Sequence, residues 1–161
     1  MIVIVMGVVG SGKTTVGRLL AEQLGWKFAD ADDFHSRANV EKIRQGIGLT
    51  DADRIPWLQS LHAAIVLWIA ERRNVVLACS ALKRSYRSEL EAGPEVRFVY
   101  LKGSASLIVS RLNARRGHFA NEQILASQLS DLEEPENALT VEIAGTPLQI
   151  VQEIRNKLAL E

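Results

Sequence analysis

A glycine-rich segment near the start of the chain has the residue types needed to hold phosphate groups. Residues 7–14 read GVVGSGKT and match the pattern G-x-x-x-x-G-K-[ST]. The glycines allow a tight turn whose backbone N–H groups face phosphate oxygens. In such a loop the lysine reaches the β- and γ-phosphates and the threonine hydroxyl ligates Mg²⁺. We therefore expect a bound nucleotide to be contacted by Gly7, Val8, Val9, Gly10, Ser11, Gly12, Lys13, Thr14 and Thr15.

An acidic stretch, FADADDFHSR at residues 28–37, is the second candidate for chemistry. Taken alone, it suits a metal site, a solvated run of charge, or a place where a substrate is held and deprotonated. The apolar run VVLAC at 75–79 lacks the aspartate that ordinarily ends the partner strand of a phosphate loop. A metal ion would therefore need a carboxylate from elsewhere, and Asp30 or Asp32 could supply it.

Two basic segments could complete the site. In RLNARRGHF, residues 111–119, Arg111 and Arg115 lie four apart and share a helical face. One guanidinium could stack on a base while the other clamps phosphate, although cations at a helix end are common without a function. Gly117 could be the hinge of a lid over residues 116–130. In CSALKRSYR, residues 79–87, Ser80 ends a strand, so Lys83, Arg84 and Arg87 would face either a cleft or solvent.

Two further polar residues are better explained by structure than by catalysis. No base is placed beside Cys79 by any motif, so a buried thiol that fills space is the favoured interpretation. His62 lies in an apolar helical pattern and is expected to be a hydrogen-bonded structural residue.

The elements that must position these residues alternate between strand and helix. Short apolar runs at 2–6, 27–29, 75–79, 96–101 and 139–143 are separated by helical patterns. This alternation predicts an α/β fold of three layers. About five parallel strands form the middle layer, and about seven helices in total form the two outer layers. We expect Pro56 in the first turn of its helix, with Asp51 or Asp53 as cap. The pattern at 56–70 is apolar nearly all round, which fits either deep burial or the interface of a homodimer.

Composition limits the class of protein. The chain has 161 residues, which predicts a single domain, 1–161. Its 19 basic and 19 acidic residues balance, so the total charge does not favour nucleic acid or an anionic membrane as a partner. No apolar run is as long as a membrane span. One cysteine allows no internal disulfide and suits the reducing cytoplasm.

The motifs together resemble the small gluconokinases of the P-loop kinase group. The resemblance covers most of the chain and is carried by MGVVGSGKT, FADADDFHSRANVEKIRQGIGLTDADRIPWLQSL, ACSALKRSYRSEL, FVYLKG and SRLNARRGHF…LASQLSDLEEP, in this order. It implies a P-loop NTPase fold like that of shikimate and adenylate kinases. It also implies phosphorylation of D-gluconate at its 6-hydroxyl by Mg-ATP. One departure is Ala31, where the family's acidic motif usually has glycine.

The resemblance also implies roles for individual residues. Asp30 would hold Mg²⁺ with Thr14, and Asp32 would accept the proton of the attacking hydroxyl. Arg111 would pack against adenine, and Lys13 and Arg115 would act on the transferred phosphoryl group. The sugar acid would be bound by Asp32, His35, Arg37, Ser80, Lys83, Arg84 and His118.

Two other functions stay open at this point. A kinase of the same class could act on shikimate or another small hydroxy acid, because the phosphate loop does not identify the acceptor. A nucleotide-binding regulator without transfer activity is the other alternative. A GTPase is disfavoured, because the chain has no N-K-x-D motif.

Overall fold

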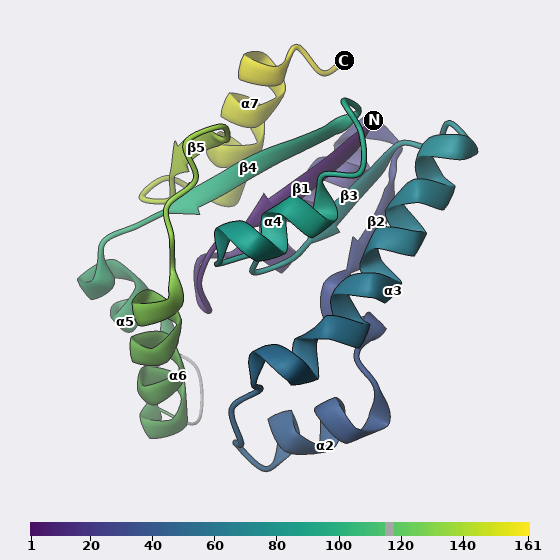
Figure 1. Ribbon diagram of the computed structural model, residues 1–161. Helices are drawn as coiled ribbons and strands as arrows, with labels where there is room; N and C mark the ends of the chain where they lie inside the picture. The colour runs from purple at the N-terminus through teal and green to yellow at the C-terminus, as the bar shows by residue number, and fades with distance from the viewer. Residues whose placement is uncertain (115–117) are drawn as a thin grey trace.

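A five-stranded parallel sheet forms the centre of the molecule, in the strand order β2-β3-β1-β4-β5 (Figure 1). The computed structural model describes residues 1–114 and 118–161, with side chains throughout except at 118–121. Within this part of the chain, the three-layer fold predicted from the alternation of elements is confirmed. The strands are β1 (Ile2–Met6), β2 (Lys27–Asp30), β3 (Val75–Ala78), β4 (Val96–Lys102) and β5 (Leu139–Glu142).

Helices cover both faces of the sheet. Helices α3 and α4 pack on one face, and α1 and α7 pack on the other. A short 3₁₀ helix, Ala31–Phe34, directly follows β2. The α-helices of the described residues are α1 (Lys13–Leu24), α2 (Arg37–Arg44), α3 (Asp51–Ala70), α4 (Arg84–Leu90), α5 (Ala105–Asn113), α6 (His118–Asp131) and α7 (Pro147–Leu158).

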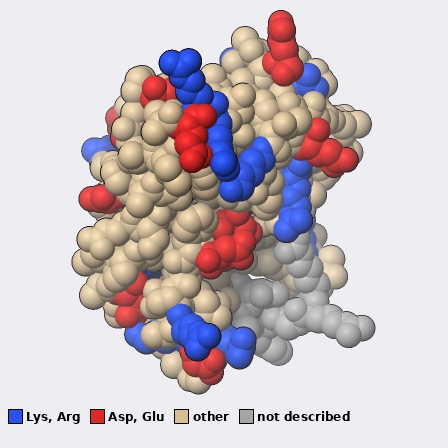
Figure 2. Space-filling view, turned by 90° about the vertical axis from the view of Figure 1, so that its right-hand side faces the viewer, with Lys and Arg blue, Asp and Glu red and all other residues tan. Residues whose placement is uncertain are grey.

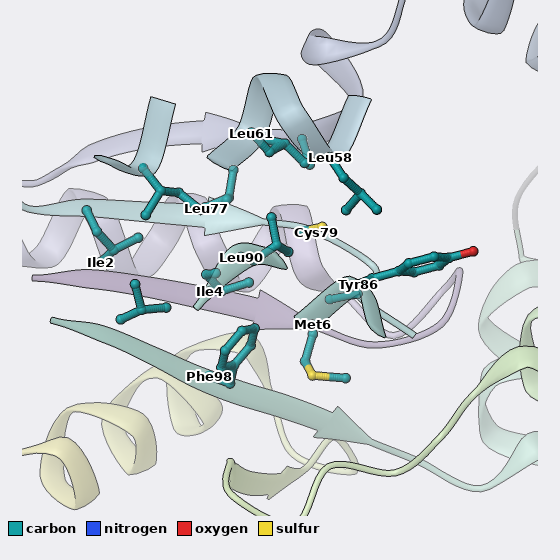
Figure 3. Packing of buried hydrophobic residues seen from close by; sticks show 14 of the residues in the cluster. Ile2, Ile4, Met6, Leu58, Leu61, Leu77, Cys79, Tyr86, Leu90 and Phe98 are labelled. Atoms are coloured by element: carbon teal, nitrogen blue, oxygen red, sulfur yellow. The ribbon is translucent and has the colours of Figure 1, made fainter. Parts of the chain in front are cut away.

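Each central strand contributes side chains to two separate hydrophobic clusters. All five residues of β1 are buried, with Ile2 and Ile4 facing α3 and α4, and Val3 and Val5 facing α1 and α7. This explains why the strand has no polar alternation, since both of its faces are covered. Figure 3 shows the first cluster, in which Ile4 lies among side chains of β3, β4, α3 and α4. The central strands are thus fixed on both faces, and the loops at their ends start from a rigid base.

Helix α3 begins earlier than the sequence pattern indicated. Its N-cap is Thr50, whose hydroxyl accepts from the Asp53 N–H at 3.1 Å while the Asp53 carboxylate accepts from the Thr50 N–H at 2.9 Å. The placement of Pro56 in the first turn is therefore wrong, because the reciprocal capping at Thr50 starts the helix five residues before it. Of the two explanations for its apolar pattern, deep burial is wrong, since Val66 and Leu67 are exposed, and a homodimer interface stays a prediction.

The carboxyl ends of the strands meet at one edge of the sheet, and two helices extend beyond that edge. Figure 1 shows α2 on one side of this edge and α6 on the other. On the face drawn in Figure 2, acidic and basic side chains are interspersed, in keeping with the balanced total charge. None of the described helices combines the length and apolar character needed to cross a bilayer.

The capping carboxylate of α3 gives a test of this fold. The Lys42 ammonium donates to Asp53 at 2.9 Å, and together with the Thr50 N–H it lowers the pKa of Asp53 from 3.8 to about 2. Because the pKa is lower in the folded protein, ionised Asp53 stabilises the fold above about pH 4, and this contribution is lost as the pH falls towards 2. We expect Asp53→Asn to lower the free energy of unfolding at pH 7, with the deficit shrinking between pH 4 and pH 2.

Urea denaturation of both proteins across this pH range measures the effect. Glu41→Gln, which removes a partner of the exposed Arg44, is the control and should change stability little at any of these pH values. A deficit of Asp53→Asn that is the same at pH 7 and pH 2 would contradict the assigned ion pair.

Candidate active site

The phosphate loop leaves the first N–H groups of α1 without a protein cap. Gly10 and Gly12 have φ values of 79° and 94°, a left-handed backbone that glycine adopts without strain. Gly12 is the N-cap of α1 and provides no side chain to accept from the first turn. The positive end of α1 is thus free to bind an anion, and the observed loop has the form that phosphate binding requires.

Lys13 lies at the centre of this anion site. Its Nζ donates to the Val8 carbonyl at 3.1 Å. Burial lowers the pKa of Lys13, while the Cys79 thiol and the carboxylates of Asp32 and Asp30 raise it. A phosphate placed here would supply the negative charge that a desolvated ammonium lacks.

The acidic stretch lies directly across from the phosphate loop. Asp30 ends β2, and one of its oxygens, Oδ1, accepts from the Asp32 N–H at 2.9 Å, which starts the 3₁₀ helix. The other oxygen, Oδ2, accepts from the Thr14 hydroxyl at 3.5 Å. Two hard oxygen donors therefore converge from separate elements. Mg²⁺ prefers this chemistry, and it commonly takes only one or two protein ligands and completes its shell with water and phosphate, so Thr14 and Asp30 fit the ion.

The Asp32 carboxylate is open to the same cavity as Lys13. Although solvent reaches it, the surrounding protein partly desolvates it, and this burial raises the pKa of Asp32. The nearby Asp30 adds to the increase, and Lys13 opposes it. A carboxylate whose proton affinity is raised is better suited to accept a proton than an ordinary surface aspartate.

These groups line one cavity of about 340 Å³ at the carboxyl edge of the sheet. Ala78 at the end of β3 and the two residues that follow it, Cys79 and Ser80, line the cavity, and α6 supplies Gln128. The sequence interpretation assigned no role to Gln128, although it lies in LASQLSDLEEP, one of the segments that carried the resemblance. The lining residues are Val9, Gly10, Gly12, Lys13, Thr14, Thr15, Asp30, Asp32, Ala78, Cys79, Ser80 and Gln128.

Trp57 of α3 contacts the acidic stretch at two residues, Ala31 and His35. Its indole Nε1 donates to the Ala31 carbonyl at 2.7 Å, and both residues are buried. Its ring stacks on His35, with 4.5 Å between ring centroids and 12° between planes. Ala31 has no positive φ and its methyl group packs in the core, so this position does not need the glycine found in the family motif.

The predicted sugar-acid residues are only partly brought together. His35 lies against Trp57 and is within 3.3 Å of the Asn39 amide, and burial lowers its pKa, with Arg54 adding to the decrease. Lys83 pairs with Asp51 at 3.1 Å. Arg37 is exposed at the start of α2. None of these three lines the cavity of the phosphate loop.

Three predicted arginines have partners away from this cavity. Arg87 does not face solvent as expected, because it is buried and donates to the carbonyls of Ala81, Leu82 and Glu133. Arg84 pairs with Glu136 at 3.7 Å and lines a separate cavity beside α4. The Arg111 guanidinium donates to the carbonyl of Ile143. Arg115 and the side chain of His118 lie outside the described residues, so their predicted roles stay predictions.

The two residues assigned to structure behave as expected. Cys79 is buried, and this burial raises the pKa of its thiol to about 12, so it is not an activated nucleophile. His62 Nδ1 is 2.6 Å from the Glu89 carbonyl and joins α3 to the end of α4.

The chain is similar in sequence and fold to kinases of small molecules. The family model for shikimate kinase matches residues 9–159. A probable gluconokinase of Rattus norvegicus is 48% identical over an alignment of 153 residues, and the match covers 83% of this chain and 83% of the relative. The gluconokinase of Gluconobacter oxydans is 47% identical, over 82% of this chain and 75% of the relative. The chain belongs to the gluconokinase family.

Solved structures agree with this assignment. A gluconokinase from Sinorhizobium meliloti is 43% identical and has a TM-score of 0.86, with 98% of this chain and 90% of that chain covered. A shikimate kinase from Aquifex aeolicus is 16% identical and has a TM-score of 0.64, so it shares the fold alone.

The Trp57–Ala31 hydrogen bond predicts a specific cost of substitution. Trp57→Phe leaves the buried Ala31 carbonyl without its donor, which we expect to destabilise the protein by about 1–3 kcal/mol beyond the effect of lost volume. Turnover should also fall, because the backbone before Asp32 loses its support. Urea denaturation and a steady-state kinase assay measure the two effects.

Trp68→Phe is the matched control, since Trp68 is also buried and no hydrogen bond from its indole to a described residue is observed. It should lose stability through volume and through weaker ring contacts with Phe34 and Lys27, and it should keep turnover near the native value, because no hydrogen bond to the acidic stretch is removed. Equal stability and equal turnover of the two variants would show that the Trp57 hydrogen bond does not support the site.

Proposed function

We propose that the protein transfers the γ-phosphoryl group of ATP to the 6-hydroxyl of D-gluconate, giving 6-phospho-D-gluconate and ADP. The observation that carries the proposal is the convergence of the phosphate loop with Asp30 and Asp32 in one cavity. A loop of this kind binds a triphosphate, and a carboxylate beside it can deprotonate an alcohol. Similarity to gluconokinases over most of the chain supports D-gluconate as the alcohol.

The loop and the acidic stretch would divide the chemistry between them. Lys13 and the N-terminus of α1 would bind the phosphates. Thr14 and Asp30 would hold Mg²⁺, which neutralises charge on the phosphate oxygens when bound. As the bond from the 6-oxygen to the γ-phosphorus forms, Asp32 would take the hydroxyl proton. The bond from phosphorus to the β-phosphate oxygen breaks, and ADP leaves with that electron pair.

The sugar acid would lie between the cavity and α2. Ser80 can hydrogen-bond a substrate hydroxyl. His35, Arg37 and Lys83 are the predicted partners for the other hydroxyls of the sugar acid and for its carboxylate. Arg84 would have to leave Glu136 to join them, and Lys83 would exchange Asp51 for the substrate carboxylate. This exchange is inexpensive, because both ion pairs are exposed to solvent on at least one side.

Further features of the enzyme belong to the same proposal. We propose that residues 1–161 act as one kinase domain and that a lid over about residues 116–130 brings Arg115 and His118 to the phosphates, with Arg111 against adenine. A cytoplasmic location fits the supply of ATP and the single cysteine. Whether the exposed part of α3 forms a homodimer stays a prediction.

A panel of acceptors tests the substrate. We expect ADP release from Mg-ATP only when D-gluconate is added, and none with shikimate, because the chain is far more similar to gluconokinases than to the shikimate kinases of the same fold. Chelation of Mg²⁺ with EDTA should abolish the release. A product labelled with ¹³C at carbon 6 should show ³¹P coupling at that carbon. Activity with shikimate and not with D-gluconate would contradict the proposed acceptor.

A further inference from the structure

Gln128 of α6 makes a direct contact with the phosphate loop. Its Oε1 accepts from the Val9 N–H at 2.6 Å, across 119 residues of sequence. The side chain is half-buried and lines the same cavity as Lys13, Thr14 and Asp32. This is the contact by which α6 reaches the middle of the loop.

The contact determines which way the amide faces. Because the Val9 N–H is a donor, the amide must present its oxygen to the loop, and its nitrogen lies on the opposite side of the same planar group. No hydrogen bond from Gln128 Nε2 to a described residue is observed. The side chain thus brings a neutral NH₂ donor, without a partner in the described chain, to the wall of a cavity suited to phosphate.

The helix that carries Gln128 is anchored just beyond it. The Glu133 N–H donates to the Leu82 carbonyl at 2.9 Å, and the Arg87 guanidinium donates to the Glu133 carbonyl at 2.7 Å. On the other side of Gln128, Leu125 is buried in the hydrophobic cluster that includes α1 and α5. Gln128 is therefore held against the loop from both directions, and within the proposed lid range 116–130 it belongs to the end that stays fixed to the rest of the protein.

We propose that Gln128 is a further catalytic residue, whose Oε1 fixes the phosphate loop through Val9 and whose Nε2 donates to the γ-phosphoryl group of ATP. The proposal rests on the proposed phosphotransfer and adds to it a specific ligand of the transferred group. During transfer, negative charge is spread over the equatorial oxygens of that group. A preorganised neutral donor stabilises this charge and needs no reorganisation as the reaction proceeds.

Gln128→Glu separates the two functions of the amide. Glutamate keeps the length and an oxygen for the Val9 N–H, but it replaces the NH₂ donor by a carboxylate oxygen that repels phosphate. We expect kcat to fall about 10²–10³-fold, as for the loss of one preorganised donor. The affinity for a non-hydrolysable ATP analogue, measured by calorimetry without acceptor, should fall at least about tenfold, whereas that for ADP should change less than about threefold, because ADP has no γ-phosphate.

Gln123→Glu is the matched control, because it makes the same charge change at an exposed position of α6. It should keep native kcat and nucleotide affinities. Gln128→Met, which has similar length but neither donor nor acceptor, should also lose kcat and affinity for the ATP analogue. Native ADP affinity in any variant shows that the loop is folded, so a loss confined to the ATP analogue cannot come from misfolding.

The opposite result is equally clear. If Gln128 instead competes with phosphate for the Val9 N–H, Gln128→Met will bind the ATP analogue more tightly than the native protein and keep its kcat, which would overturn the proposal. Nucleotide binding needs no acceptor, so the two proposals fail separately. A native protein that is inactive with D-gluconate but discriminates the ATP analogue through Gln128 would contradict only the proposed substrate.

Discussion

The site depends on the parallel adjacency of β2, β3 and β1. In the register of the sheet Asp30 pairs with Ala78, and Ala78 pairs with Val5, so the ends of β2 and β1 are level and separated only by β3. Two strand spacings amount to about 10 Å, which is bridged by Thr14 in the first turn of α1 and Asp30 at the end of β2. The 3.5 Å contact of Thr14 with Asp30 is the result. A strand order with β2 farther from β1 would separate the acidic stretch from the phosphate loop.

This adjacency has an electrostatic consequence. Burial lowers the pKa of Lys13 and raises the pKa of Asp32, so each group is held in surroundings that disfavour its charge. Each group also opposes part of the pKa shift that burial causes in the other, since the carboxylate favours the charged ammonium and the ammonium favours the charged carboxylate. Such tension between desolvation and pairing is typical of active sites, where a substrate supplies the missing interactions. Here Mg-ATP would bring both the anion and the cation.

The sequence predicts most of the fold, because its strongest signals are local. The phosphate motif between a strand and a helix and the alternation of apolar runs with helical patterns each depend on neighbouring residues, and the order of strands and helices that they predict is confirmed. The start of α3 was missed because the capping pair Thr50–Asp53 outweighed the preference of Pro56 for the first turn. The sequence prediction therefore differed from the structure in the boundary of this helix and not in the fold.

The details of the site could be predicted less well, because they depend on contacts between distant segments. No local pattern shows that Gln128 would meet Val9, that Trp57 would hold the Ala31 carbonyl, or that Lys83 would pair with Asp51. The acidic stretch is an intermediate case. Its residue types indicated a metal or substrate site, and the packing of β2 beside β3 is what places Asp30 within reach of Thr14, while both Asp30 and Asp32 line the cavity.

The central claim is that the acidic stretch and the phosphate loop form one site in which Asp32 takes the proton of the acceptor. Asp32→Asn tests it most directly, with Asp33→Asn as control on the adjacent exposed carboxylate. Turnover with Mg-ATP and D-gluconate should fall about 10²–10⁴-fold in Asp32→Asn, the usual contribution of a general base. Affinity for ATP should change little, and Asp33→Asn should keep native turnover. Native turnover of Asp32→Asn would contradict the account.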